Sequence, residues 1–141
     1  MADITITAAS LQASASATRN LQYSAGATLA VGDMVYLNAS NQWVQTDANA
    51  AATGNGPSDL RGIVESAGAL NQRISVITKD PALVIGATLV KGTVYVGSAN
   101  AAKVAPIADL ATGWYRWLVG VASSTTVINF DPNALASGAT D

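Results

Sequence analysis

Residues 26–48 read GATLAVGDMVYLNASNQWVQTDA, and the chain repeats this phrasing sixty residues later, where residues 86–113 read GATLVKGTVYVGSANAAKVAPIADLATG. Matching the Val-Tyr pairs in the two copies gives an offset of 59, as though the second copy lacked one residue after Gly92. Further on, Gly62-Ile63-Val64 corresponds to Gly120-Val121-Ala122. Repeats at a fixed spacing indicate a repeated structural unit, and two copies are too few for a solenoid. We therefore predict one domain in which two similar β units cover each other's apolar faces.

The pattern between the glycines is β throughout. Short runs rich in Val, Ile, Tyr and Trp are separated by Gly and Asn turns, which is typical of a small β-barrel or β-sandwich with little helix. A hairpin centred on Ala69 would set Glu65 opposite Arg73, and Lys79-Asp80-Pro81 is expected to be a turn between the units. The expected strands are 35–37, 43–46, 60–65, 73–78, 93–96, 103–105, 114–122 and 126–130, of which 114–122 is the longest.

The two ends of the chain differ from this pattern. Residues 4–7 alternate like a short strand, and residues 8–18 are mostly Ala and Ser, which allows either helix or irregular chain. We expect residues 1–24 to form an extended N-terminal arm that is ordered by the surface on which it lies. Residues 25–132 then form the single β domain, with repeats at about 25–80 and 85–130, and residues 133–141 a flexible tail.

The amino-acid composition excludes several classes of function for this chain. Only 11% of the residues are charged and the net charge is −2, so the chain lacks the basic face that nucleic-acid binding needs. It has no His and no Cys, which removes the commonest general base, the commonest transition-metal ligands and the thiol nucleophile. We find no targeting segment and no apolar run long enough for a membrane span. We therefore expect no catalytic, metal or cofactor site, and partners that are neither nucleic acid nor membrane.

Three groups of residues are candidate sites. Asp59, Arg61 and Glu65 share one face of an expected strand, which fits a solvated ion-pair ladder better than a carboxylate pair for catalysis. The glycine-rich run 53–57 lacks the lysine of a phosphate-binding loop and is expected to be a surface turn. The tryptophans Trp43, Trp114 and Trp117 are expected chiefly in the core, with a subunit interface or a ligand platform as alternatives.

The two quoted repeats, each followed by a Gly-(Val/Ile)-(Val/Ala) strand, resemble the head-decoration (capsid cement) proteins of tailed bacteriophages over residues 25–130. That resemblance implies a non-enzymatic β domain that binds the major capsid protein on the virion surface as a homotrimer, often through an extended arm. It also implies assembly in the host cytoplasm. The alternatives are a phage tail or fibre module, or a carbohydrate-binding β module that uses the tryptophans.

Overall fold

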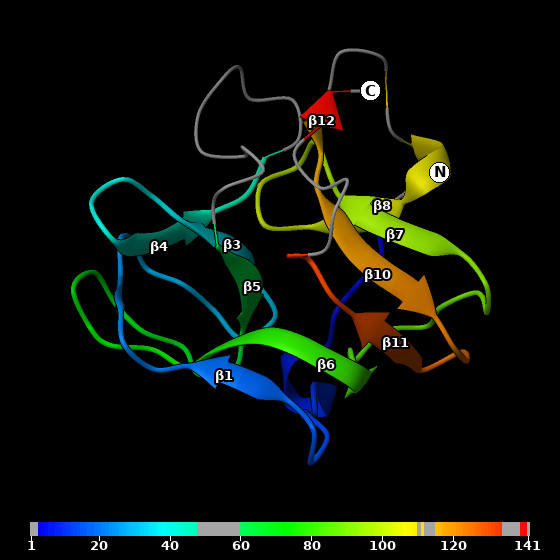
Figure 1. Cartoon of the computed structure of the whole chain (residues 1–141), viewed down its shortest axis with the longest axis horizontal. Helices are drawn as coiled ribbons and strands as arrows, with labels where there is room; N and C mark the ends of the chain where they lie inside the picture. The colour runs from blue at the N-terminus through cyan, green and yellow to red at the C-terminus, as the bar shows by residue number, and fades with distance from the viewer. Residues whose placement is uncertain (1–2, 48–59, 110, 112–114, 134–138, 141) are drawn as a thin grey trace.

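The structure is a computed structural model that describes residues 3–47, 60–109, 111, 115–133 and 139–140. Within these ranges the chain is almost entirely β, with two short 3₁₀ turns and no α-helix, so the all-β prediction is confirmed (Figure 1). The elements in chain order are η1 (Ala8–Ser10), β1 (Thr18–Asn20), β2 (Ser24–Ala25), β3 (Met34–Leu37), β4 (Gln42–Gln45), β5 (Arg61–Val64), β6 (Val76–Val84), β7 (Val94–Gly97), β8 (Val104–Pro106), η2 (Ile107–Asp109), β9 (Tyr115–Arg116), β10 (Leu118–Ala122), β11 (Val127–Phe130) and β12 (Ala139–Thr140).

Ten of these strands form one sheet, in the order β2-β4-β3-β5-β6-β11-β10-β7-β8, with β1 paired to β6; β9 and β12 form a separate ribbon. The sheet is not closed into a barrel, so of the two predicted architectures the barrel is wrong. The reason is that other segments of the chain form hydrogen bonds with both edge strands, β2 and β8. Ala25 in β2 donates its backbone N–H to Gln72, and Val104 in β8 accepts from the backbone N–H of Ile4. Covered edges also resist pairing with the edges of other molecules.

The two repeats fold into equivalent units. The order β4-β3-β5-β6 of the first unit is matched, from the other end of the sheet, by β8-β7-β10-β11 of the second (Figure 1). The backbone N–H of Gly32 donates to Val64 at 2.9 Å, and that of Gly92 donates to Ala122 at 2.8 Å. Both glycines have positive φ, 92° and 84°, in the region that residues with a side chain rarely adopt.

Strand pairing corrects the predicted offset of 59. Val35 lies opposite Gly62, and Tyr95 lies opposite Gly120, so Val35 corresponds to Tyr95 and the offset stays at sixty. The second copy therefore lacks no residue after Gly92. Letter identity was misleading because Val-Tyr occurs in both strands one position apart, whereas hydrogen-bond register decides which face each side chain occupies.

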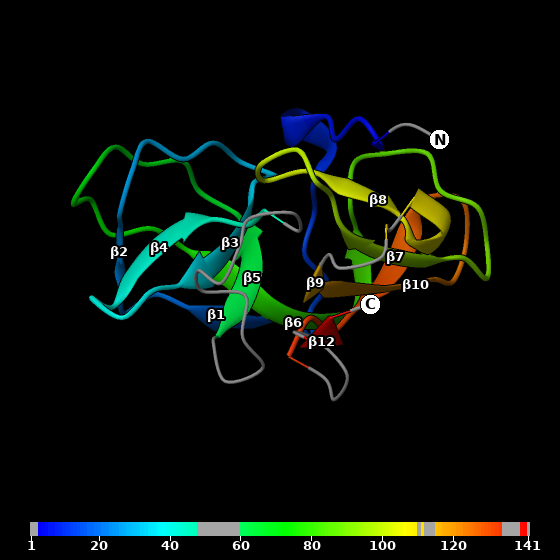
Figure 2. The same ribbon diagram turned by 90° about the horizontal axis from the view of Figure 1, so that it is seen from above.

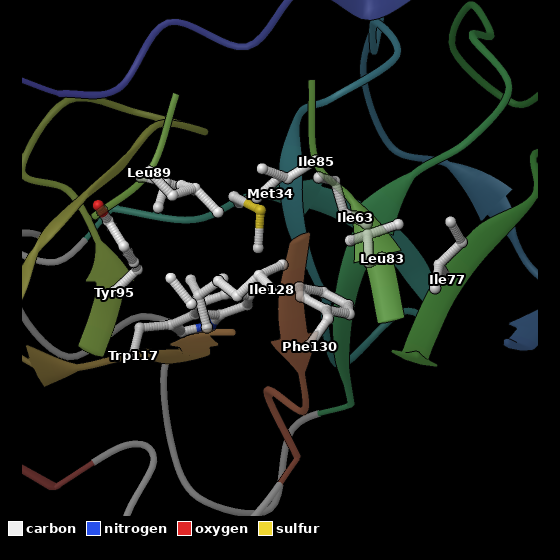
Figure 3. Close-up of a cluster of buried hydrophobic side chains, with 13 residues drawn as sticks. Met34, Ile63, Ile77, Leu83, Ile85, Leu89, Tyr95, Trp117, Ile128 and Phe130 are labelled. Atoms are coloured by element: carbon white, nitrogen blue, oxygen red, sulfur yellow. The ribbon is translucent and has the colours of Figure 1, made fainter. Parts of the chain in front are cut away.

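The two units share one hydrophobic core. Met34, Ile63 and Ile77 are cross-strand neighbours on β3, β5 and β6, and all three are fully buried. They pack in the same cluster as Trp117 and Phe130 of the second unit, as Figure 3 shows. The expectation that the units cover each other's apolar faces is therefore met, and this shared cluster holds the halves of the molecule together.

The opposite face of the first unit has its own, smaller cluster. It contains Trp43 of β4, together with Val35, Val64 and Val76 from the sheet and Leu29 from the repeat turn. Trp43 and Trp117 are both fully buried, which confirms the core interpretation for these two tryptophans. Trp114 and the glycine-rich run 53–57 lie outside the described residues.

Strand β6 departs most from the predicted strands. It runs from Val76 to Val84 and is the longest of the described strands, so Lys79-Asp80-Pro81 is not a turn but lies in its middle. The first part of β6 pairs with β5 and the second part with β11, where the register shifts between Ile128 and Phe130. Pro81 is tolerated at this irregularity because a bulge leaves a backbone position that needs no ladder hydrogen bond.

Two further predictions, one of a hairpin register and one of a continuous strand, are wrong. Ile63 pairs with Ile77 and Val64 with Val76, so the hairpin is centred on residue 70 and Glu65 faces Ser75, not Arg73. The expected long strand 114–122 is also interrupted, because β9 ends at Arg116 and β10 begins at Leu118. The break falls at Trp117, whose side chain turns into the core.

The N-terminal segment, residues 3–20, lies across both units of its own chain. Thr7 donates its backbone N–H to Gly86 at 2.8 Å, Gln12 and Val84 exchange two backbone hydrogen bonds, and β1 pairs with β6. Figure 2 shows this segment, in blue, running between the two halves of the molecule. Residues 4–7 do not form the predicted strand, and η1 begins directly after them. The N-terminal arm therefore packs against the domain as an extended, irregular segment.

Candidate interaction surface

Of the three charged residues expected on one strand face, Arg61 and Glu65 lie within the described residues, and they differ in burial. Arg61 is buried, and its guanidinium carbon lies 5.9 Å from the ring centroid of Trp117, within the range of a cation–π contact. Glu65 lies near the surface, where its carboxylate accepts from Nε of Arg19 at 2.7 Å and from the hydroxyl of Ser75 at 2.8 Å. Asp59 lies outside the described residues. The expectation of a solvated ladder is therefore wrong for Arg61, which is buried.

The Arg19–Glu65 pair predicts a small dependence of stability on pH. The hydrogen bond from Arg19 lowers the pKa of Glu65 below its ordinary value. A lowered pKa in the folded state gives stability that is present above the unfolded pKa of about 4.3 and lost as the pH falls through the folded value. We expect Glu65→Gln to be less stable than the wild type in urea unfolding at pH 7, and the difference to vanish at acidic pH. A difference that persists unchanged at acidic pH would contradict the role of this pair.

Asp80 is a buried carboxylate that sequence reasoning placed in a turn. It is fully buried in the middle of β6. Its oxygens accept from the backbone N–H of Ser14 at 2.7 Å, from the hydroxyl of Ser14, and from the backbone N–H of Ala82 at 3.0 Å. A buried carboxylate is tolerated when donors surround it in this way. Asp80 therefore fastens the N-terminal segment to the sheet.

Replacing Asp80 by alanine is expected to destabilise the fold by about 2–4 kcal/mol, because three donors lose their acceptor. Ser14→Ala removes only the hydroxyl and is expected to cost about 1–2 kcal/mol. Urea unfolding measures both, and limited proteolysis should cleave residues 3–20 faster in the Asp80 variant. Equal cleavage rates in the wild type and Asp80→Ala would show that this carboxylate does not hold the segment.

Two small hollows lie against the N-terminal segment. One of about 190 Å³ is lined by the N-terminal segment, the turn at Gly32 and residues 102–104. Another of about 260 Å³ lies between the same segment and the turn at Gly86. Ligand pockets for drug-sized molecules usually measure about 300–1,000 Å³. The described residues contain no group of three or more acidic side chains that could hold a metal ion, and no helix among them could cross a membrane.

The described surface also carries several large apolar side chains that are exposed. Leu21 and Val90 are 62% and 66% exposed, and Leu70, Ile107 and Val121 are also exposed. The outer side of the N-terminal segment adds exposed small residues, namely Thr5, Thr7, Ala8, Ala9 and Ser10. Exposed apolar side chains of this size are common in the contact surfaces of proteins.

A comparison of the chain with models of known protein families, with curated protein sequences and with solved structures finds no match.

Proposed function

We propose that this chain is a structural subunit of a tailed-phage virion, which binds the major capsid protein on the outside of the head as a homotrimer and stabilises the shell without catalysing a reaction. The observation that carries the proposal is a set of five exposed large apolar side chains on a scaffold whose two sheet edges are already covered. A module of this kind adds area to its neighbours without polymerising through its strands.

The physical requirement on such a protein is modest. A contact that buries about 800 Å² per partner is an ordinary protein interface. Repeated over a symmetric shell, contacts of moderate affinity reinforce one another because each bound copy holds several shell subunits together. A closed cyclic trimer limits growth to a defined size, whereas an open contact would produce filaments. The shared core supplies the rigidity that such a clamp needs.

Co-sedimentation with expanded capsids of the phage that encodes the chain tests the proposal. We expect the protein to pellet with capsids and to raise the temperature at which they open. Lysine substitutions of Leu21, Leu70, Val90 and Ile107, made one at a time, should include at least one that weakens binding about tenfold, since this corresponds to only about 1.4 kcal/mol. Protein that stays in the supernatant would contradict the capsid role.

Two observations distinguish the capsid role from the alternatives, which are a tail or fibre module and a carbohydrate-binding module. Negative-stain labelling of intact particles would place the chain on the tail or fibre if the head remains unlabelled. A carbohydrate-binding role through the tryptophans is disfavoured for Trp43 and Trp117, because both are fully buried and offer no face to a sugar.

A further inference from the structure

The two repeats use their sheet faces differently. In the first unit, the row formed by Met34, Ile63 and Ile77 across β3, β5 and β6 is fully buried in the shared core. The same positions in the second unit are Val94, Val121 and Asn129, which are cross-strand neighbours across β7, β10 and β11. We call these three residues the outer row. Directly opposed residues on neighbouring strands share a face, so the outer row forms one continuous stripe.

The outer row is not covered by the chain itself. Val121 is 43% exposed, Asn129 is exposed and Val94 is half-buried. The second unit instead turns its other face inward, with Tyr95 and Phe130 on either side of Gly120 in the shared core. On β11 the inward face carries Ile128 and Phe130, and the register with β6 shifts between these two residues.

The exposed stripe continues onto the neighbouring strands. Val127 lies two residues before Asn129 on β11 and therefore on the same face, and it pairs with Val84 of β6. Val84 in turn pairs with Gln12 of the N-terminal segment. None of these six side chains is charged. In the first unit the equivalent row is covered, and it packs there against another uncharged β face.

We propose that the outer row is the contact surface for a second copy of this chain, with two copies meeting row to row about a two-fold axis at Val121. A two-fold contact brings identical residues together, so it tolerates only surfaces that do not repel themselves. The valines satisfy this requirement, and the amide of Asn129 carries both a donor and an acceptor and can pair with its own counterpart. A contact of this kind is separate from those that close a cyclic trimer, and on a shell it joins subunits of neighbouring trimers.

Cysteine crosslinking tests the proposal on purified protein without capsids, so its outcome is independent of capsid binding. The chain has no cysteine, so a single introduced thiol reports one position. We expect oxidised Val121→Cys to run as a covalent dimer as its main species, because a disulfide requires the two Cβ atoms to approach within about 4.5 Å. The matched control is Leu21→Cys, at an apolar position that is more exposed than Val121 and lies outside the stripe, and it should stay monomeric on the gel.

A second variant separates the contact from folding. Val121→Lys places a charge at the proposed axis, and analytical ultracentrifugation should give a lower mass than that of the wild type, with an unchanged far-UV spectrum. Leu21→Lys should keep the wild-type mass. The proposal is overturned if Val121→Cys stays monomeric under oxidation, if Leu21→Cys crosslinks equally well, or if Val121→Lys keeps the wild-type mass.

Discussion

Replacing Gly120 by alanine is expected to destabilise the protein by about 3 kcal/mol or more, and to prevent folding at physiological temperature if the wild type is marginal. A Cβ atom at Gly120 would overlap the backbone oxygen of Asn129 on the neighbouring strand. Backbone cannot move aside as a flexible side chain can, so β10 and β11 would have to separate. Gly62 occupies the same position in the first unit, where a Cβ would lie 2.5 Å from the backbone oxygen of Ile77. Gly62→Ala should therefore have a similar effect.

Gly92→Ala is the control for these two variants. An added Cβ at Gly92 meets nothing within 4 Å, and only the positive φ of 84° opposes it. We expect a cost of about 1 kcal/mol, from backbone conformation alone. Urea unfolding followed by far-UV circular dichroism measures all three variants. Losses for Gly120→Ala and Gly62→Ala no larger than that for Gly92→Ala would show that the strands do not approach as described.

Ile63→Ala is expected to cost about 2–5 kcal/mol, while Val121→Ala is expected to cost less than about 1 kcal/mol. The two residues occupy the same place in the two repeats, since Ile63 pairs with Met34 and Val121 pairs with Val94. Ile63 is fully buried between the units, whereas 43% of Val121 is exposed. Truncating the first leaves a cavity in the shared core, and truncating the second leaves only a shallower surface.

Urea unfolding of dilute protein measures the loss of stability in Ile63→Ala and in Val121→Ala. The protein is kept dilute so that contacts between copies do not contribute to the free energy of unfolding. The comparison is matched because both substitutions shorten a β-branched residue in the central strand of a repeat. Equal losses for the two variants would contradict the statement that the repeats present opposite faces to the core.

The repeat is what made the fold predictable. Two blocks that begin Gly-Ala-Thr-Leu, each with a second glycine three residues later, were enough to predict two similar β units with a common core. The turns and the strands near 35–37, 43–46, 60–65, 93–96 and 126–130 followed from local patterns of β-branched and aromatic residues, and β3, β4, β5, β7 and β11 lie there.

Register and the path of β6 could not be predicted in the same way. Lys79-Asp80-Pro81 has the composition of a turn, and two of the three donors that satisfy the buried carboxylate of Asp80 come from Ser14, sixty-six residues away. Asn133 is a similar case, because its side chain binds the backbone N–H and C=O of Arg61 although it begins the predicted tail. Contacts between distant segments decide such positions, and local propensity carries no information about them.

The exposure of the outer row could not be predicted from the sequence either. Val121 reads in the sequence as an ordinary strand residue, and its exposure becomes evident only when the pairing with Val94 and Asn129 is known. No signal in the sequence distinguishes it from Ile63, its counterpart in the first unit. The buried state of Trp43 and Trp117, in contrast, agrees with the usual preference of large aromatic residues for the core.

Native-state hydrogen exchange tests most directly whether the two repeats fold as one body with a shared core. The informative amides are those of Val64, bonded to Asp33, and Ala122, bonded to Thr93, which are equivalent in the two units, and that of Met34, which donates to Ala102 across them. If the units share one core, all three should exchange through the same global opening, with the same free energy and the same denaturant dependence. Two separate free energies, one for Val64 and a lower one for Ala122, would show that the repeats unfold independently and would contradict the shared core.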